Sequence, residues 1–245
     1  MRRMRPSFPD LPHSARGMAM LLDFDGTLVD IAATPDAIVV PPGLRETLHG
    51  VTTACAGALA IISGRTIDEL DAFLHPLRLP IAGEHGAAVR VSPDAPITRP
   101  PLPVLPDAWS EAATAMSRQH DGVLLERKQA GFVLHYRRRP DIGAQLHAAL
   151  AALLGTGSAF EIMPAACAWE VRPRGIDKGV AVRQLMRHSP FRGRAPVFIG
   201  DDVTDEDGIA AARALGGSGL RVAEHFGDAA GVRAWLAGLA VPACA

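Results

Sequence analysis

Short apolar runs and amphipathic segments alternate along the first third of the chain. Met18–Leu22, Ala58–Ile62 and Leu79–Ala82 are apolar runs whose length is typical of buried strands and too short for helices. A helix is expected to open at Pro41-Pro42, because proline is tolerated in a first turn. A second helix is expected to follow Thr66 as its cap. On the first helix, apolar side chains recur on one face: Leu44, Leu48, Val51 and Cys55. This order of strands and helices predicts a parallel sheet with crossover helices.

The pattern changes in the middle of the chain. Pro93–Pro106 is rich in proline and predicts an extended connection at a domain boundary. After it, helices and short paired strands suggest a small α+β unit. The expected helices are Asp107–His120 and Asp141–Leu154, and the expected strands are Val123–Lys128, Phe132–Arg137, Phe160–Met163 and Trp169–Arg172.

The α/β rhythm then resumes. The pattern predicts a helix over Asp177–His188, a buried strand over Pro196–Gly200, a helix over Thr204–Leu215, a strand over Leu220–Ala223 and a helix over Asp228–Leu239. The predicted fold is α/β: a parallel-sheet core formed by residues 1–100 and 176–245, interrupted by an inserted α+β cap over residues 101–175.

Composition narrows the class of protein. The chain has 245 residues, of which 48% are hydrophobic, and a formal net charge of −1, so neither a nucleic acid nor an anionic membrane is indicated as a partner. No apolar run reaches the length of a membrane span, and no apolar segment follows Arg2, Arg3 and Arg5 as a signal peptide requires. Cys55, Cys167 and Cys244 lie far apart without CxxC spacing, which favours reduced thiols in a cytoplasmic protein over a zinc site or disulfides.

Polar motifs stand where the core strands are expected to end. They are Asp23-Phe24-Asp25-Gly26-Thr27, Ser63-Gly64-Arg65 and Gly200-Asp201-Asp202, and Lys178, from a separate part of the core, starts a helix. Ligands of α/β sheets bind at the carboxyl ends of the strands, so we expect these groups to meet there. Four carboxylates suit Mg²⁺, and the serine hydroxyl and the lysine suit phosphate oxygens. The set predicts phosphoryl transfer.

These motifs resemble those of the haloacid dehalogenase (HAD) superfamily of phosphatases, whose core is Rossmann-like. The closer resemblance is to the trehalose-6-phosphate phosphatases, and it extends from about residue 18 to about residue 225. It is carried by AGEHGA at 82–87, ERK at 126–128, HYR at 135–137, EVRPRGIDKG at 170–179 and FIGDDVTDED at 198–207. The motifs within the cap make this resemblance more specific than the first aspartate motif, which indicates only the superfamily.

The resemblance implies a role for each residue of the core motifs. Asp23 would attack phosphorus to form an aspartyl-phosphate, and Asp25 would protonate the leaving oxygen and then activate water. Ser63 and Lys178 would hold the phosphoryl group. Mg²⁺ would be bound by Asp23, the backbone carbonyl of Asp25 and Asp201, with Asp202 and Asp205 as direct ligands or nearby supports. Arg65 would either bind substrate or brace its loop, and both alternatives stay open.

The cap would recognise the sugar, because charged side chains bind sugar hydroxyls well. The expected substrate-binding residues are Glu126, Lys128 and Glu170, followed by His135, Arg137 and Glu84 at the hinge. Cap closure would exclude water from the reaction.

The resulting hypothesis is a monomeric, Mg²⁺-dependent phosphatase that converts trehalose 6-phosphate into trehalose and phosphate, the dephosphorylation step of trehalose biosynthesis. One alternative is a capped HAD phosphatase that acts on sucrose phosphate or a mannosyl phosphate. A second is an inactive sugar-phosphate sensor, although both Asp23 and Asp25 are present. A third is a phosphate-accepting signalling domain, which needs neither Asp25 nor a cap.

Overall fold

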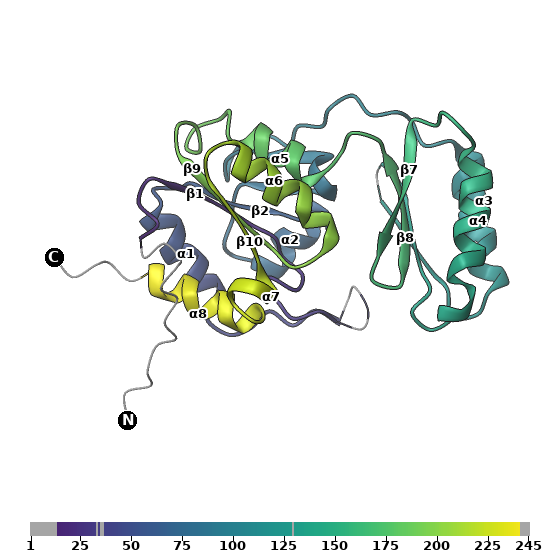
Figure 1. The fold of residues 1–245 in the computed structure, drawn as a ribbon, viewed down its shortest axis with the longest axis horizontal. Coiled ribbons are helices and arrows are strands. Elements are labelled where there is room, and N and C mark those ends of the chain that lie inside the picture. Colours follow the sequence, from purple (N-terminus) through teal and green to yellow (C-terminus); the bar gives the residue numbers. More distant parts are fainter. Residues whose placement is uncertain (1–13, 33, 35–36, 129, 241–245) are drawn as a thin grey trace. The chain divides into compact units, whose positions relative to one another are not determined.

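The chain folds into two compact units. The computed structural model describes residues 14–32, 34, 37–128 and 130–240. The core unit contains the described residues of segments 1–98 and 177–245, and the cap unit contains those of segment 99–176 (Figure 1). We describe each unit by itself.

A six-stranded sheet forms the centre of the core unit. Its strand order is β10-β9-β1-β2-β3-β4, and all neighbours are parallel except β3 and β4. The strands are β1 (Met18–Leu22), β2 (Leu59–Ile62), β3 (Ile81–Gly83), β4 (Ala88–Arg90), β9 (Ala195–Gly200) and β10 (Ser218–Arg221). Strand β2 lies on one side of β1 and β9 on the other, so the chain reverses its winding direction at β1. In such sheets this switch point is where ligands bind.

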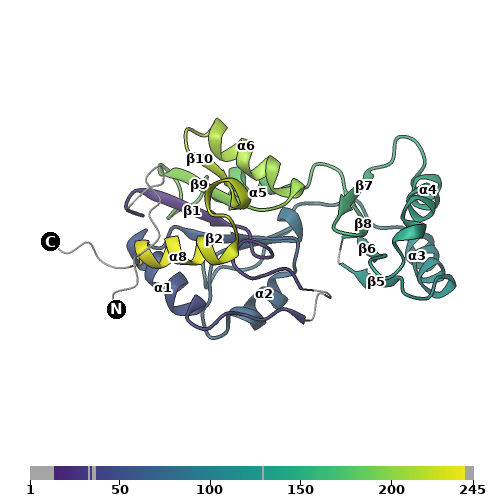
Figure 2. The ribbon, with the colours of Figure 1, turned by 60° about the horizontal axis from the view of Figure 1, so that its bottom comes forward.

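Helices cover both faces of the core sheet. They are α1 (Leu44–Ala54), α2 (Ile67–Leu74), α5 (Lys178–Leu185), α6 (Glu206–Ala214), α7 (Val222–His225) and α8 (Ala229–Leu239). Helices α5 and α6 lie side by side on one face, and α1 and α8 lie together on the other (Figure 2). Because both faces are covered, strands β1 and β2 are apolar throughout, and Met20, Leu21 and Leu22 of β1 have no exposed surface.

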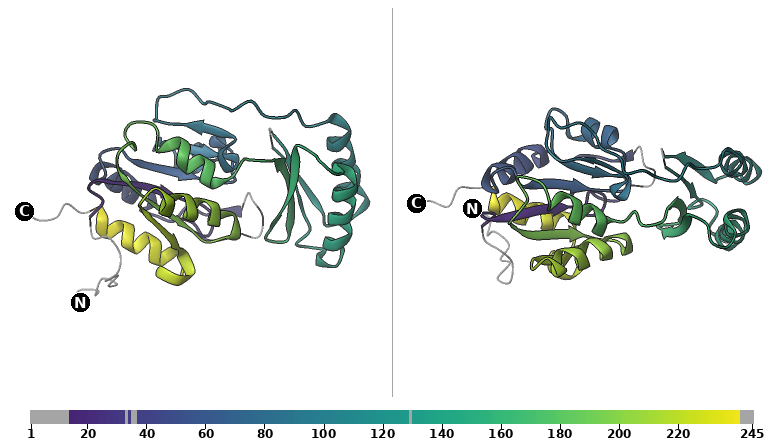
Figure 3. Two further views of the ribbon diagram at one scale, coloured as in Figure 1. Left: turned by 45° about the horizontal axis from the view of Figure 1, so that its top comes forward. Right: turned by 90° about the horizontal axis from the view of Figure 1, so that it is seen from above.

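The cap unit is an antiparallel sheet covered on one face by two helices (Figure 3). The strand order is β5-β6-β8-β7, with β5 at Leu124–Arg127, β6 at Phe132–His135, β7 at Phe160–Ala165 and β8 at Ala168–Pro173. The helices are α3 (Asp107–Gln119) and α4 (Gly143–Leu154). Phe132, Leu134 and Val171 of the sheet pack with Leu146 and Leu150 of α4 into a separate apolar core.

Several element boundaries differ from the sequence-based prediction, and three of them are described here. Helix α1 begins at Leu44 rather than at Pro41-Pro42, because Gly43 has a left-handed backbone with φ +80°. The predicted strand Leu220–Ala223 is displaced, since β10 ends at Arg221 and the chain then forms the short helix α7. Strand β5 ends at Arg127, one residue before the predicted end.

The described residues cover only part of what was predicted about cysteines, a signal peptide and membrane spans. Cys55 and Cys167 are free thiols, whereas Cys244 and the arginines at positions 2, 3 and 5 lie outside the described residues. Within residues 14–240, as far as they are described, no helix combines the length and the apolar character needed to cross a bilayer.

Candidate active site

Three predicted residues follow directly after neighbouring parallel strands. Asp23 follows β1, Ser63 follows β2, and Asp201 follows β9. The backbone N–H of Asp23 donates to the carbonyl of Ile199 at 2.9 Å, which fixes the end of β1 against β9. All three residues therefore lie at the carboxyl edge of the sheet, beside the switch point.

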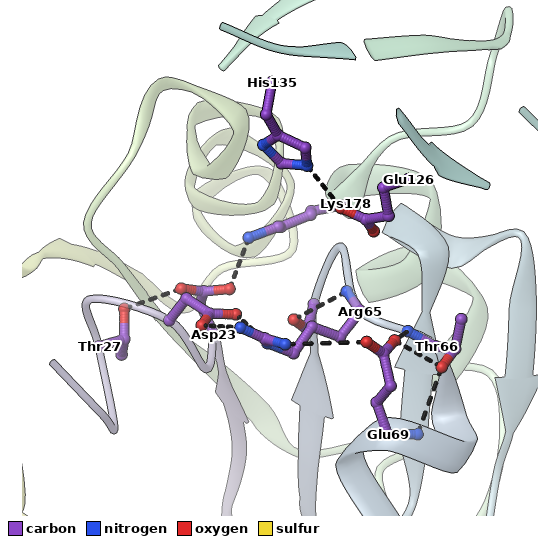
Figure 4. A network of polar contacts seen from close by, with 10 residues as sticks. Asp23, Thr27, Arg65, Thr66, Glu69, Glu126, His135 and Lys178 are labelled. Atoms are coloured by element: carbon purple, nitrogen blue, oxygen red, sulfur yellow. Dashed lines mark hydrogen bonds and ion pairs between the residues drawn. The ribbon is translucent and has the colours of Figure 1, made fainter. Parts of the chain in front are cut away.

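Lys178 connects two buried carboxylates at this edge. Its Nζ donates to Oδ1 of Asp23 at 2.7 Å and to Oδ1 of Asp205 at 2.6 Å. All three side chains are at least 95% buried. Burial alone would lower the pKa of Lys178, but the two carboxylates outweigh burial and raise it. Lys178 is therefore an ammonium ion aimed at Asp23 (Figure 4).

Asp23 is held from a second side as well. The hydroxyl of Thr27 donates to Oδ2 of Asp23 at 3.1 Å (Figure 4). The turn between these residues needs Gly26, whose φ is +73° and where a Cβ atom would lie 2.0 Å from Oδ2 of Asp201. The missing side chain of Gly26 therefore leaves the space that the Asp201 carboxylate occupies.

Three carboxylates of the site lie close enough to share one cation. Oxygen atoms of Asp23, Asp201 and Asp205 lie within 4.8 Å of one another. Burial, followed by repulsion from Asp205, raises the pKa of Asp23 well above its usual range, although Lys178 opposes the shift. The same two causes raise the pKa of Asp201 to about 6. A divalent cation would relieve this repulsion, and an all-oxygen donor set fits Mg²⁺.

Asp202 and Asp205, both predicted as direct ligands or nearby supports of the metal, lie in different surroundings. The Asp202 carboxylate accepts the N–H of Val203 at 2.6 Å and is not among the three clustered carboxylates. Asp205 is fully buried, and its Oδ2 accepts the N–H groups of both Asp201 and Asp202 at 3.0 Å. A single turn of 3₁₀ helix, Val203–Asp205, brings Asp205 back beneath the loop.

The loop after β2 is fastened by the segment after β3. The N–H groups of Glu84 and His85 donate to the carbonyls of Arg65 and Ser63, each at 2.9 Å. Both residues have left-handed backbones, with φ of 52° and 57°, and their side chains are buried. A Cβ atom on Gly64 would lie 2.7 Å from the His85 ring. Non-glycine residues in this conformation are strained and cluster at functional sites.

Ser63 is buried in this loop, and Arg65 reaches from it to Asp25. The hydroxyl of Ser63 accepts the N–H of Arg65 at 3.2 Å. The Arg65 guanidinium donates to both carboxylate oxygens of Asp25, at 2.7 and 2.8 Å. The two carboxylates of the first motif therefore have different partners: Asp23 contacts an ammonium ion, and Asp25 contacts a planar guanidinium.

In the cap unit, four predicted sugar-binding residues form an ion pair and a side-chain hydrogen bond. Lys128 Nζ lies 2.9 Å from Oε1 of Glu170, and Nε2 of His135 lies 2.8 Å from Oε2 of Glu126. Glu126 and Glu170 share one row across the sheet, because both pair with Val133. Burial would raise the pKa of Glu126, but the hydrogen bond with His135 and the charge of Lys128 outweigh it and lower the pKa. Glu126, Lys128, His135 and Glu170 together form a polar, partly buried patch on the sheet, which we call the polar row.

Arg137 is the predicted cap residue that lies apart from these pairs. It is exposed, follows β6, and donates to the carbonyl of Ala166 at 3.3 Å. No contact of Arg137 with the four residues of the polar row is recorded among the described residues.

Comparison with solved structures defines the class of this fold. The C-terminal domain of C. albicans trehalose-6-phosphate phosphatase superimposes with a TM-score of 0.76, 22% sequence identity and coverage of 93% of each chain. A haloacid dehalogenase-like hydrolase from Bacteroides thetaiotaomicron superimposes with a TM-score of 0.56, 16% identity and coverage of 80% of this chain and 85% of the other. The predicted α/β fold with a parallel-sheet core is therefore confirmed, and its structural neighbours include a HAD-like hydrolase.

Sequence comparison then identifies the family. Residues 21–227 match the family model described as trehalose-phosphatase. The chain is also 37% identical over 220 residues to the trehalose-6-phosphate phosphatase of Escherichia coli (strain K12), covering 89% of this chain and 82% of that protein. The chain belongs to the trehalose-phosphatase family, which confirms the resemblance inferred from the motifs.

Proposed function

We propose that this chain hydrolyses trehalose 6-phosphate to trehalose and phosphate, the dephosphorylation step of trehalose biosynthesis. The observation that carries the proposal is the placement of Asp23, in a chain of this family: it follows β1, accepts a hydrogen bond from Lys178 and clusters with Asp201 and Asp205. Membership of the family favours this substrate over sucrose phosphate or a mannosyl phosphate.

The proposed hydrolysis proceeds in two steps. A carboxylate oxygen of Asp23 attacks phosphorus, the bond from phosphorus to the sugar oxygen breaks, and Asp25 gives its proton to that oxygen. A water molecule then loses a proton to Asp25 and attacks phosphorus, which releases phosphate and restores Asp23. Lys178 and Ser63 neutralise and orient the phosphoryl oxygens.

Asp23, Asp201 and Asp205 are the residues whose carboxylates would hold Mg²⁺, with the backbone carbonyl of Asp25 as a further donor. The ion would supply positive charge against the oxygens of the phosphoryl group. Asp202 is better placed to support the loop, because its carboxylate caps Val203 and is not among the three clustered carboxylates.

The polar row of the cap recognises the disaccharide in this proposal. Glu126, Lys128, His135 and Glu170 offer donors and acceptors held in place by their mutual hydrogen bonds, as sugar hydroxyls require. Glu84 and Arg137 stay predicted contacts of the substrate. The monomeric state and the cytoplasmic location also stay predictions, and sedimentation of the purified chain tests the first.

The experiment measures phosphate release with Mg²⁺ from trehalose 6-phosphate, sucrose phosphate, mannose phosphate and glucose 6-phosphate. We expect the highest kcat/KM with trehalose 6-phosphate. Equal values with glucose 6-phosphate would contradict the proposed specificity.

Two aspartate variants separate chemistry from folding. Asp23→Asn should abolish turnover while the protein keeps its circular dichroism spectrum. Asp30→Asn is the matched control, because Asp30 is exposed, lies in the loop after the same strand and contacts Arg233 at 3.6 Å. Substantial activity in Asp23→Asn would remove Asp23 from the role of nucleophile.

A further inference from the structure

Arg65 is held by three different groups of the core unit. Its guanidinium donates to both carboxylate oxygens of Asp25, at 2.7 and 2.8 Å. Nη1 lies 3.8 Å from Oε1 of Glu69, and the guanidinium carbon lies 5.1 Å from the centre of the Phe73 ring. The Arg65 side chain is only 12% exposed. Planar ion pairs and stacking of this kind are specific to arginine.

Helix α2 fixes the two residues behind Arg65. The second carboxylate oxygen of Glu69 accepts the N–H of Thr66 at 2.8 Å and its hydroxyl at 2.6 Å, which completes a capping box (Figure 4). Phe73, about one turn beyond Glu69, stacks on Phe24 with ring centres 5.9 Å apart. Phe24 separates Asp23 from Asp25, so the same helix also packs against the first motif.

The arrangement determines the orientation of the Asp25 carboxylate. Two parallel hydrogen bonds from a planar donor fix both the position and the plane of a carboxylate, which a single ammonium contact does not. Asp25 is 35% exposed, so without this contact its side chain has room to rotate. Misplacement of a catalytic group by about 1 Å lowers a rate on the order of a hundredfold.

We propose that Arg65 is a positioning residue for Asp25, held in place by Glu69 and Phe73, rather than a residue that binds the sugar or the phosphoryl group. This inference rests on the proposed function, in which Asp25 gives a proton to the leaving oxygen and later takes one from water. Helix α2 thereby becomes part of the proton-transfer machinery, although it contributes no residue that reacts.

The test compares two substrates that differ in their need for an acid. A sugar oxygen must be protonated as it leaves, whereas nitrophenolate leaves p-nitrophenyl phosphate as a stable anion. Because kcat/KM reports the steps up to phosphoryl transfer, Arg65→Met should lower kcat/KM for trehalose 6-phosphate about 10- to 100-fold and for p-nitrophenyl phosphate less than about threefold. Asp25→Asn should show the same contrast with a larger loss.

A double-mutant cycle separates positioning from direct contact. In the Asp25→Asn background, Arg65→Met should lower kcat/KM for trehalose 6-phosphate by less than about threefold, because its effect passes through Asp25. Glu69→Gln keeps the capping box but removes the charge facing Arg65, so it should give a smaller loss with the same contrast. Arg45→Met is the matched control, because Arg45 donates to the carbonyl of Phe73 at 2.8 Å. It should not change the ratio of kcat/KM between the two substrates.

Four results would overturn the proposal. An equal loss with both substrates that adds to the loss in Asp25→Asn would place Arg65 on the phosphoryl group. A raised KM for trehalose 6-phosphate with unchanged kcat would place it on the sugar. If Arg65→Met does not fold, Arg65→Lys replaces it, and full activity of that variant would show that charge alone suffices. In Glu69→Gln, an equal loss of kcat/KM with both substrates, or no loss, would show that helix α2 takes no part in positioning Asp25. A wild-type protein that cleaves p-nitrophenyl phosphate but no sugar phosphate would instead refute the proposed function.

Discussion

Replacing Lys178 by methionine should destabilise the core unit strongly. Lys178 forms two ion pairs, of 2.7 and 2.6 Å, with carboxylates that are 95% or more buried. With an effective dielectric constant of about 20, each contact contributes about 6 kcal/mol of attraction, most of which offsets the desolvation of the charges. Methionine matches the shape of the side chain but leaves Asp23 and Asp205 facing each other without a cation. Removing one partner of a buried ion pair typically costs about 3–5 kcal/mol, and we expect a loss of this size.

The assay is urea unfolding followed by circular dichroism in the presence of a chelator, so that no divalent cation replaces the lost charge. The core and cap units are separate compact units, and their transitions are therefore fitted separately. Asp205→Asn added to Lys178→Met should recover part of the loss, because it removes one of the two unpaired charges. A loss below about 1 kcal/mol in Lys178→Met, or a further loss in the double variant, would refute the reasoning.

Three further predictions concern titratable groups. Because burial and Asp205 raise the pKa of Asp201 to about 6, protons compete with the metal, so Mg²⁺ affinity measured by calorimetry should fall about tenfold per pH unit below about pH 6; an affinity independent of pH would contradict this. Because burial raises the pKa of Cys55 to about 11, iodoacetamide at about pH 8 should label Cys55 only in unfolded protein, as mass spectrometry of the peptides would show; fast labelling of the native protein would argue against its burial. The pKa of Glu126 is lowered in the folded protein, so its stabilising contribution is complete above its unfolded value of 4.5 and is lost as the pH falls through the folded value. The stability difference between wild type and Glu126→Gln should therefore shrink from about pH 7 to about pH 3, and a constant difference would refute the assignment.

The positions of the main site residues could be predicted from local patterns. A short apolar run followed by Asp, Gly or Ser marks the end of a buried strand, and strands of a parallel sheet end at one edge. Asp23, Ser63 and Asp201 each follow such a strand in the structure. The hydrophobic pattern does not assign roles to these residues. The roles were inferred from the family motifs, and they stay predictions.

Local patterns did not predict which side chains of the site form hydrogen bonds or ion pairs with each other. The contact between Arg65 and Asp25 joins residues 40 positions apart, and it depends on how α2 fixes the arginine. Asp202 and Asp205 are both acidic residues of one motif, and sequence alone does not show which carboxylate turns inward. The 3₁₀ turn Val203–Asp205 decides this, because it buries Asp205 while Asp202 caps the turn.

Glycines determine how closely these motifs approach one another. A Cβ atom on Gly179, the residue after Lys178, would lie 2.5 Å from the backbone carbonyl of Asp207 in α6. A Cβ atom on Gly200 would lie 2.2 Å from the carboxyl carbon of Asp205. Gly179 thus allows α5 to approach α6, and Gly200 leaves the space for the Asp205 side chain, which donor Lys178 reaches at 2.6 Å. The glycines of the two motifs are therefore as much determinants of the site as the charged residues beside them, although they contribute no chemical group.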